Sequence, residues 1–132
     1  MGPNSIAKAM AAASSGMNAQ SFRLRVVSEN LSNADTHGYQ RKLVTFESEM
    51  DAITQQGRVK VDDVMLDRSP GEVLFEPAHP LANDEGYVTL SNVDMMIELA
   101  DAREAGRSYE ANLTTFKQAA EMYGGLINLL RR

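Results

Sequence analysis

The sequence predicts an α+β fold that is mainly α: two long terminal helices pack as a coiled-coil bundle, and a small irregular β-rich module lies between them. In both terminal segments apolar residues recur at alternating steps of four and three, the heptad spacing of packed helices. The middle of the chain carries short apolar runs separated by turn-forming residues. With 132 residues the chain is sized for one domain. We expect a helical core from residues 1–33 and 91–132, and a loop and β module from 34–90.

The first helix is expected from Asn4 to Leu31, a stretch without an internal proline. The opposite face of this helix is polar, which is typical of an amphipathic helix. Its predicted seam consists of Ile6, Met10, Ala13, Met17, Gln20, Leu24, Val27 and Leu31.

The last helix is expected from Asn92 to about Leu130, with Ser91 or Asn92 as its N-cap and Asp94 in its first turn. We assign the tyrosines of the seam to the core. The predicted seam is Met95, Leu99, Ala102, Gly106, Tyr109, Leu113, Phe116, Ala120, Tyr123, Ile127 and Leu130.

A second apolar stripe follows the end of this helix. A single partner helix from the same chain cannot cover both stripes, so the pattern favours association with further subunits. We also expect both helices to be largely disordered in the free monomer and to become ordered on assembly, because helices gain most of their stability from packing. The second stripe consists of Ala119, Met122, Leu126 and Leu129.

The segment between the helices begins with a loop over residues 33–39, rich in Asn, Asp and Gly. A turn is expected at residues 83–86, and prolines keep the chain extended between 77 and 80. Short strands are predicted at residues 43–46, 59–61, 73–75 and 87–90.

Composition and charge exclude several classes of protein. The chain has no Cys, so disulfides and thiolate metal sites are excluded, and a net charge of −5 argues against nucleic acid as a partner. Residues 61–100 carry one base against nine acids. No segment has the ~20 apolar residues of a membrane span or the apolar core of a secretory signal peptide. These signals alone predict a cytoplasmic protein.

Candidate small-molecule and metal sites are weak. Asn30, Asn33 and Tyr39 either bind a ligand or cap the first helix and fix its loop, and we favour the second interpretation. The two histidines, His37 and His79, are too far apart in sequence to form a metal motif, and the acidic pairs at 62–63 and 84–85 lack the order of a calcium loop. Catalytic and nucleotide-binding fingerprints are absent. We expect no catalytic residues, no metal and no cofactor.

Several motifs occur in order along nearly the whole chain. Residues 28–34 and 36–42 read SENLSNA and THGYQRK, and they resemble the N-terminal signature of flagellar axial proteins. Further motifs resemble the family of C-type proximal rod proteins of the bacterial flagellum. They are FEPAHPLAN at 75–83, GYV at 86–88, SNVDM at 91–95 and RSYEAN at 107–112.

The resemblance implies a structural subunit that stacks helically into the rod and transmits torque from the motor to the hook. It implies assembly with copies of itself, with other rod proteins, with an export-gate adaptor of the FliE type and with the membrane ring. It also implies passage through the flagellar type III export apparatus without a cleaved signal peptide, which places the chain in the rod within the periplasm. The alternatives are a coiled-coil structural adaptor of another assembly and an enzyme.

The subunit interface is expected to combine the helix seams with the loop that follows the first helix. In the family this loop contacts neighbouring subunits, which assigns Gly38 and Tyr39 to the interface. The predicted interface residues are Ile6, Met10, Met17, Leu24, Val27, Leu31, Gly38, Tyr39, Met95, Leu99, Tyr109, Leu113, Phe116, Met122, Tyr123, Leu126, Ile127, Leu129 and Leu130.

Overall fold

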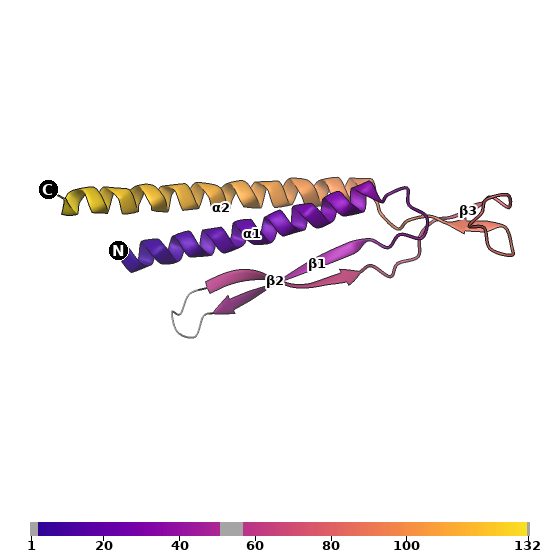
Figure 1. Ribbon diagram of the computed structural model, residues 1–132, viewed down its shortest axis with the longest axis horizontal. Coiled ribbons are helices and arrows are strands. Elements are labelled where there is room, and N and C mark those ends of the chain that lie inside the picture. The colour runs from indigo at the N-terminus through magenta and orange to yellow at the C-terminus, as the bar shows by residue number, and fades with distance from the viewer. Residues whose placement is uncertain (1–2, 51–56, 132) are drawn as a thin grey trace.

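Two long antiparallel helices dominate the molecule. The structure is a computed structural model that describes residues 3–50 and 57–131. Helix α1 spans Pro3–Ser32 and helix α2 spans Met95–Leu130. They run side by side, so that both chain ends lie at the same end of the helix pair (Figure 1). The mainly helical α+β fold is confirmed, whereas coiled-coil packing stays a prediction.

Small residues form much of the contact between the helices. A Cβ atom placed on Gly16 would lie 2.7 Å from Nδ2 of Asn112, so the backbone of α1 approaches α2 closely there. The positions that α2 buries are Glu98, Ala105 and Ala119, one residue before the predicted seam positions Leu99, Gly106 and Ala120. The buried apolar residues on α1 are Ile6, Ala13, Ala19, Val26 and Val27.

The predicted seam of α2 is therefore not its most buried line: Met95, Leu99, Tyr123 and Leu130 are exposed, and the other residues of that seam are half-buried. The buried positions 98, 105 and 119 differ by multiples of seven. Small side chains let two helices approach closely, and larger side chains at the neighbouring positions are then displaced outward. Leu99 and Tyr123 are exposed as a result, so the assignment of Tyr123 to the core of the chain was also wrong.

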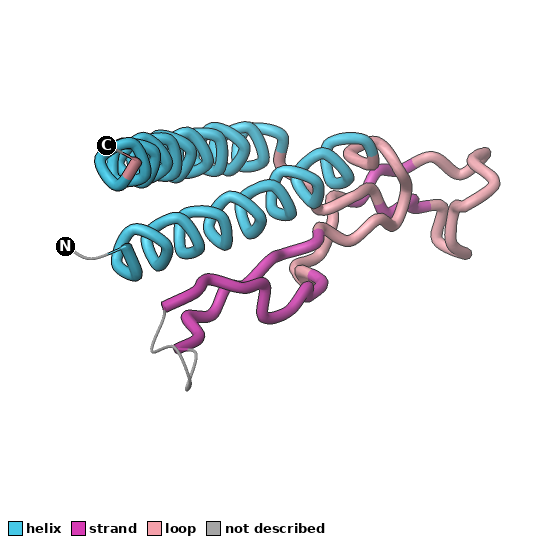
Figure 2. Tube along the Cα trace, turned by 60° about the vertical axis from the view of Figure 1, so that its left-hand side comes forward, coloured by secondary structure: helices cyan, strands magenta, loops and turns pink. Residues whose placement is uncertain are grey.

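A long β-hairpin lies along α1. Strand β1 spans Lys42–Met50 and pairs antiparallel with β2, which spans Gly57–Leu66. The pairing shifts between Thr45 and Phe46, where Asp62 is the extra residue of a bulge. Both strands contact α1, and the backbone N–H of Val59 donates to Oγ of Ser15 over 3.2 Å. Figure 2 shows the hairpin beside α1.

A small second hairpin forms a tip beyond the helices. Strand β3 spans Val73–Phe75 and pairs antiparallel with β4, which spans Tyr87–Thr89. The tip projects from the end of the molecule opposite the chain termini (Figures 1 and 2). All four predicted strands are confirmed as short antiparallel strands, although β1 and β2 are longer than the predicted runs.

The cap of α2 differs from the prediction. Asp94 is the N-cap, and its carboxylate accepts a hydrogen bond from N–H of Met96 over 3.0 Å. The prediction of Ser91 or Asn92 was wrong because the side chains of both residues bind elsewhere. Ser91 donates to the carbonyl of Ala34, and Asn92 binds the backbone of residues 41, 67 and 69. Within residues 3–50 and 57–131, no helix has the length and apolarity needed to cross a membrane.

Candidate subunit interface and buried polar junction

The predicted interface residues divide into three groups by exposure in the single chain. Two of them, Ile6 and Val27, are buried against the other elements of the chain. A middle group is half-buried: Met10, Met17, Leu24, Leu31, Tyr39, Tyr109, Leu113, Phe116, Leu126 and Ile127. The exposed group is Gly38, Met95, Leu99, Met122, Tyr123, Leu129 and Leu130.

The exposed apolar residues gather at the two ends of α2. At its N-terminal end, Met96 is 75% exposed and Ile97 is also exposed, in addition to the predicted Met95 and Leu99. Sequence reasoning missed Met96 and Ile97 because it followed one stripe only. The consecutive apolar run from 95 to 97 was the available signal, since such a run cannot point to one face of a helix.

An apolar groove lies at the C-terminal end of α2, where α1 begins. We call it the end groove, and its volume is about 320 Å³. Three of its residues belong to the second apolar stripe, and Ile6 of α1 covers only part of that stripe. A single helix from the same chain thus leaves the stripe partly uncovered. The lining residues are Ile6, Met122, Gly125, Leu126 and Leu129.

At the opposite end of the helix pair, Asn30 anchors the loop after α1. Its Nδ2 donates to the carbonyl of Lys42 over 3.0 Å, and its Oδ1 accepts from N–H of Lys42 over 2.9 Å. The hydroxyl of Tyr39 donates to the same Oδ1 over 2.9 Å. Asn33 closes the helix by donating to the carbonyl of Glu29. These bonds support the capping and loop-fixing interpretation. Gly38 has a φ of +75°, which favours glycine at this turn.

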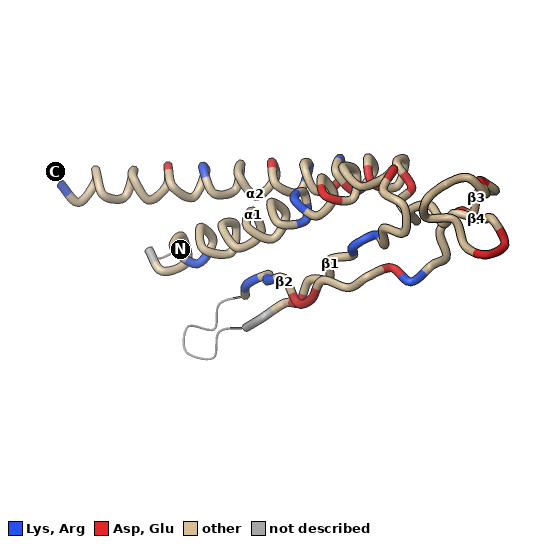
Figure 3. The backbone as a smooth tube through the Cα atoms, turned by 45° about the vertical axis from the view of Figure 1, so that its right-hand side comes forward, with Lys and Arg blue, Asp and Glu red and all other residues tan. Residues whose placement is uncertain are grey.

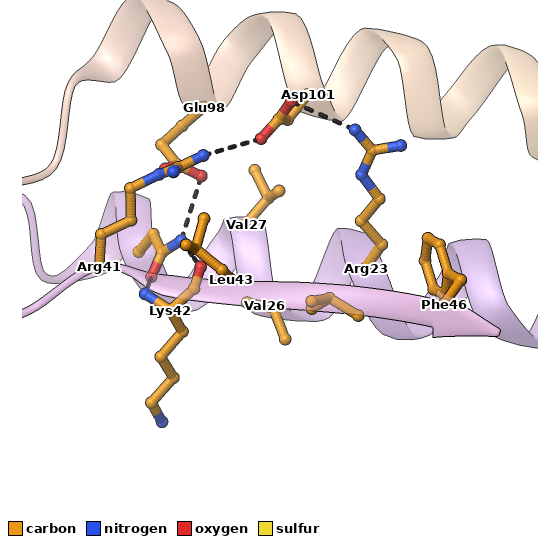
Figure 4. Close-up of a pocket in the computed structure, with 11 residues that line it drawn as sticks. Arg23, Val26, Val27, Arg41, Lys42, Leu43, Phe46, Glu98 and Asp101 are labelled. Atoms are coloured by element: carbon orange, nitrogen blue, oxygen red, sulfur yellow. Dashed lines mark hydrogen bonds and ion pairs between the residues drawn. The ribbon is translucent and has the colours of Figure 1, made fainter. Parts of the chain in front are cut away.

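Arg41 joins three segments of the chain at this end. Its guanidinium forms an ion pair with Glu98, whose side chain is 0% exposed. It also lies 3.0 Å from Oδ2 of Asp101 and 3.8 Å from Oδ2 of Asp67. Asn30 donates to the other oxygen of Glu98 over 3.2 Å, so the buried carboxylate is bound on both oxygens (Figure 4). We call Asn30, Arg41, Glu98 and Asp101 the polar junction.

The sequence did not indicate the polar junction. Arg41 lies within a family motif, but nothing in its sequence context distinguished it from an exposed arginine. Glu98 reads as a favourable acid in the first turn of α2, where it would ordinarily face solvent. The one available signal was a seven-residue step from Glu98 to the small residue at 105, which places the carboxylate on the contact face.

Charge and burial shift several pKa values in this region. Burial alone would lower the pKa of Arg41, but the hydrogen bond to Glu98 and the nearby carboxylates raise it overall. Hydrogen bonds from Ser69, together with Arg41, lower the pKa of Asp67 below its usual value of 3.8. Burial, and then the charge of Glu29, raise the pKa of the Tyr39 phenol. The surroundings thus favour the charged forms of Arg41 and Asp67 and the neutral form of Tyr39.

A cavity of about 260 Å³ adjoins the junction, between α1, α2 and β1. Among the residues that line it, Arg23 lies 3.2 Å from Oδ1 of Asp101 (Figure 4). Outside the cavity, Glu104 lies 3.3 Å from Arg23 and Glu29 pairs with Lys42. Such paired groups position the backbone and leave none free for acid–base chemistry. In the part of the chain that the structure describes, no three His, Cys, Asp or Glu residues cluster to hold a metal. The rings of His37 and His79 do meet, with centroids 4.6 Å apart.

Two family models match this chain. The model described as "Flagella basal body rod protein" matches residues 10–40, which form most of α1 and its loop. The model described as "Flagellar basal body rod FlgEFG protein C-terminal" matches residues 84–129, which include β4 and nearly all of α2. Both long helices, with the junction residues Asn30, Glu98 and Asp101, therefore match a class of flagellar rod proteins, and Arg41 follows the first matched range directly.

Curated relatives narrow this class. The chain is 44% identical to the flagellar basal-body rod protein FlgC of Agrobacterium fabrum, over 90% of this chain and 91% of the relative. It is 37% identical to FlgC of Escherichia coli O6:H1 and 36% identical to FlgC of Salmonella typhimurium. Both matches cover 83% of this chain and 87% of the relative. The chain belongs to the FlgC family of flagellar basal-body rod proteins, a family of structural subunits and not of enzymes.

Proposed function

We propose that the chain is a subunit of the proximal rod that stacks helically with copies of itself and with other rod proteins. In this role it transmits torque from the motor to the hook. The observation that carries the proposal is the exposure of large apolar side chains along α2, at Met96, Leu99, Tyr123 and Leu130. Exposed apolar surface of this kind normally marks an association site, because burying it removes apolar area from water.

The polar junction supports a load-bearing role. Arg41 ties the start of β1 to α2 and to the segment that follows β2, while Asn30 ties α1 to the same point. The β-hairpin and the helix pair are thus joined at one end by several charge-assisted bonds. The junction is thus a direct polar link from the hairpin to α2, in addition to the contacts of both strands with α1.

We further propose the export-gate adaptor of the FliE type, the membrane ring and the type III export apparatus as partners. The proposed location is the rod within the periplasm, reached without a cleaved signal peptide. These proposals rest on the family resemblance of the motifs at 28–42 and 75–95.

The distribution of charge suggests how the subunit is oriented. We propose that residues 1–33 and 91–132 form the helical core of the rod and that 34–90 lie at larger radius. Uncompensated burial of charge is costly, so exposed acids should face solvent or a basic neighbour. Figure 3 shows acids along the β segments and the tip. A map of the assembled rod that placed these acids along its inner channel would contradict the orientation: Asp62, Asp63, Asp67, Asp84 and Glu85.

The test of the function is complementation of a strain that lacks this gene. Leu126→Asp and Leu129→Asp place a carboxylate in the end groove, which should prevent apolar association. We expect loss of swimming and of rod assembly, with the protein still made and exported. Asn128→Asp is the matched control, because it adds the same charge at an exposed position of the same turn and should retain motility. Normal swimming of both leucine variants would contradict the interface, and normal rods in the deletion strain would contradict the function.

A further inference from the structure

The tip exposes almost all of its apolar side chains. Of the apolar residues in β3 and β4 only Val88 is buried, whereas Phe75 is 60% exposed. Leu81, in the connection between the two strands, is 65% exposed. The ring of Phe75 meets that of Tyr87 edge to face, with centroids 5.2 Å apart, so the two aromatic side chains form one projecting surface. A hairpin this small cannot bury such residues by itself.

Acids surround this apolar surface. The sequence contains no Lys or Arg between Arg68 and Arg103, so the tip carries negative charge only. Figure 3 shows acidic positions around β3 and β4. An apolar centre with a charged rim is the usual anatomy of a protein interface, and aromatic residues are common at its centre. The exposed acids of the tip are Glu72, Glu76, Asp84 and Glu85.

The opposite end of the molecule has complementary properties. The end groove is open and apolar, and beside it Leu130 is 85% exposed. The basic residue Arg131 follows in the sequence. In Figure 1 the tip and the C-terminal end of α2 lie at opposite ends of the long axis. The chain thus carries an acidic apolar projection at one end and, at the other, an apolar groove that Arg131 follows in the sequence.

We propose that the tip of one copy docks into the end groove of a second copy. Phe75 and Leu81 contact the groove between Met122 and Leu129, and the acids of the tip face Arg131. The inference rests on the proposed self-assembly and specifies which surfaces meet. A symmetric contact between two tips would bring acid against acid, whereas a tip-to-groove contact pairs opposite charges. Such a head-to-tail contact leaves a free tip at one end and a free groove at the other, so it repeats along a filament unless its rotation closes a ring.

The experiment uses purified full-length chain and two kinds of variant. Leu81→Asp or Phe75→Ser impairs the tip, and Leu129→Asp impairs the groove. Because Leu81 is exposed and lies between the two strands, Leu81→Asp tests docking even if Phe75→Ser disturbs the hairpin. We expect the unmodified chain to form species that lengthen with concentration and shorten with salt. Each variant alone should associate at least about tenfold more weakly, as for loss of one interface anchor. Analytical ultracentrifugation measures the size of the species and the strength of association.

The decisive sample is an equimolar mixture of Leu81→Asp and Leu129→Asp chains. One intact tip and one intact groove remain, so the mixture should form dimers and nothing longer. Met65→Ser, an exposed apolar change on β2, is the control and should associate like the unmodified chain. Three results would overturn the inference: the unmodified chain stays monomeric, the mixture stays monomeric, or the tip variants associate like the unmodified chain. If Leu129→Asp blocks rod assembly but Leu81→Asp does not, this inference fails while the proposed function stands.

Discussion

Asn30 on α1 donates a hydrogen bond to the buried carboxylate of Glu98 on α2, over 3.2 Å. This bond links the last turns of α1 to the first turns of α2, at the end of the helix pair opposite the chain termini. The same carboxylate binds Arg41, so the two helices and the following loop meet at one charged group. Breaking a buried pair on one side costs far more than breaking an exposed one, because a buried charge is left alone.

The first prediction concerns Glu98. Glu98→Gln keeps the shape of the side chain but removes the charge that Arg41 faces, so the free energy of unfolding should fall by about 2–4 kcal/mol. Glu104→Gln is the control, because it makes the same change in an ion pair whose acid is 69% exposed. That variant should lie within about 0.5 kcal/mol of the unmodified chain. Urea denaturation followed by circular dichroism measures both, and equal losses would contradict a special role for the junction.

The second prediction concerns the pH dependence of stability through Asp67. The folded chain holds the pKa of Asp67 below 3.8, so folding favours the charged form. The contribution is present above the unfolded pKa and is lost as the pH falls through 3.8 toward the lower folded value. The melting temperature should therefore fall less steeply below pH 4 in Asp67→Asn than in the unmodified chain. Ser69→Ala removes the hydroxyl that donates to the carboxylate of Asp67, so the melting temperature of this variant should also fall less steeply below pH 4. Unchanged profiles in both variants would refute the assignment.

The third prediction compares two glycines in helices. Gly16→Ala places a Cβ atom 2.7 Å from the amide of Asn112, which must then give up its bond to the carbonyl of Ser108. Gly106→Ala meets no atom within 4 Å and gains helix propensity of about 0.8–1 kcal/mol. We expect Gly16→Ala to be less stable than Gly106→Ala by about 1–2 kcal/mol. Asn112→Ala should remove most of that difference when combined with Gly16→Ala. Thermal melts of the unmodified chain, Gly16→Ala, Gly106→Ala and the double variant Gly16→Ala with Asn112→Ala measure these differences in stability.

The fourth prediction concerns order in the free monomer. The contacts of the chain are uneven along the helix pair, since the polar junction holds one end and the end groove leaves the other partly uncovered. We expect amide hydrogen exchange of a verified monomer to be slowest near Val27 and Glu98 and fast in the last turns of α2, around residues 120–130. On assembly the same amides should become protected. Strong, uniform protection across residues 6–31 and 95–130 in the monomer would show that the helices fold fully without partners.

The sequence determined the main features of this protein by local physical rules. Heptad spacing without internal proline requires long helices, and short alternating runs between turn residues require short strands. Both signals depend only on neighbouring residues, so they can be read without knowledge of the tertiary contacts. The ordered motifs from residue 28 to 112 likewise identified the family before any geometry was known. The uncovered second stripe predicted that Met122 and Leu129 need a neighbour, and the end groove agrees with that expectation.

Only the tertiary structure decided which of two adjacent stripes on α2 faces α1. Residue 98 is a glutamate, so the apolar pattern alone pointed to the stripe with 99 and 106 and away from the stripe with 98 and 105. The close approach at Gly16 and the charge of Arg41 selected the stripe with Glu98 and Ala105. Burial of Glu98 depends on a cation far away in the sequence, because an unpaired carboxylate would be expelled from the contact. Such a choice rests on long-range partners, which no local pattern contains.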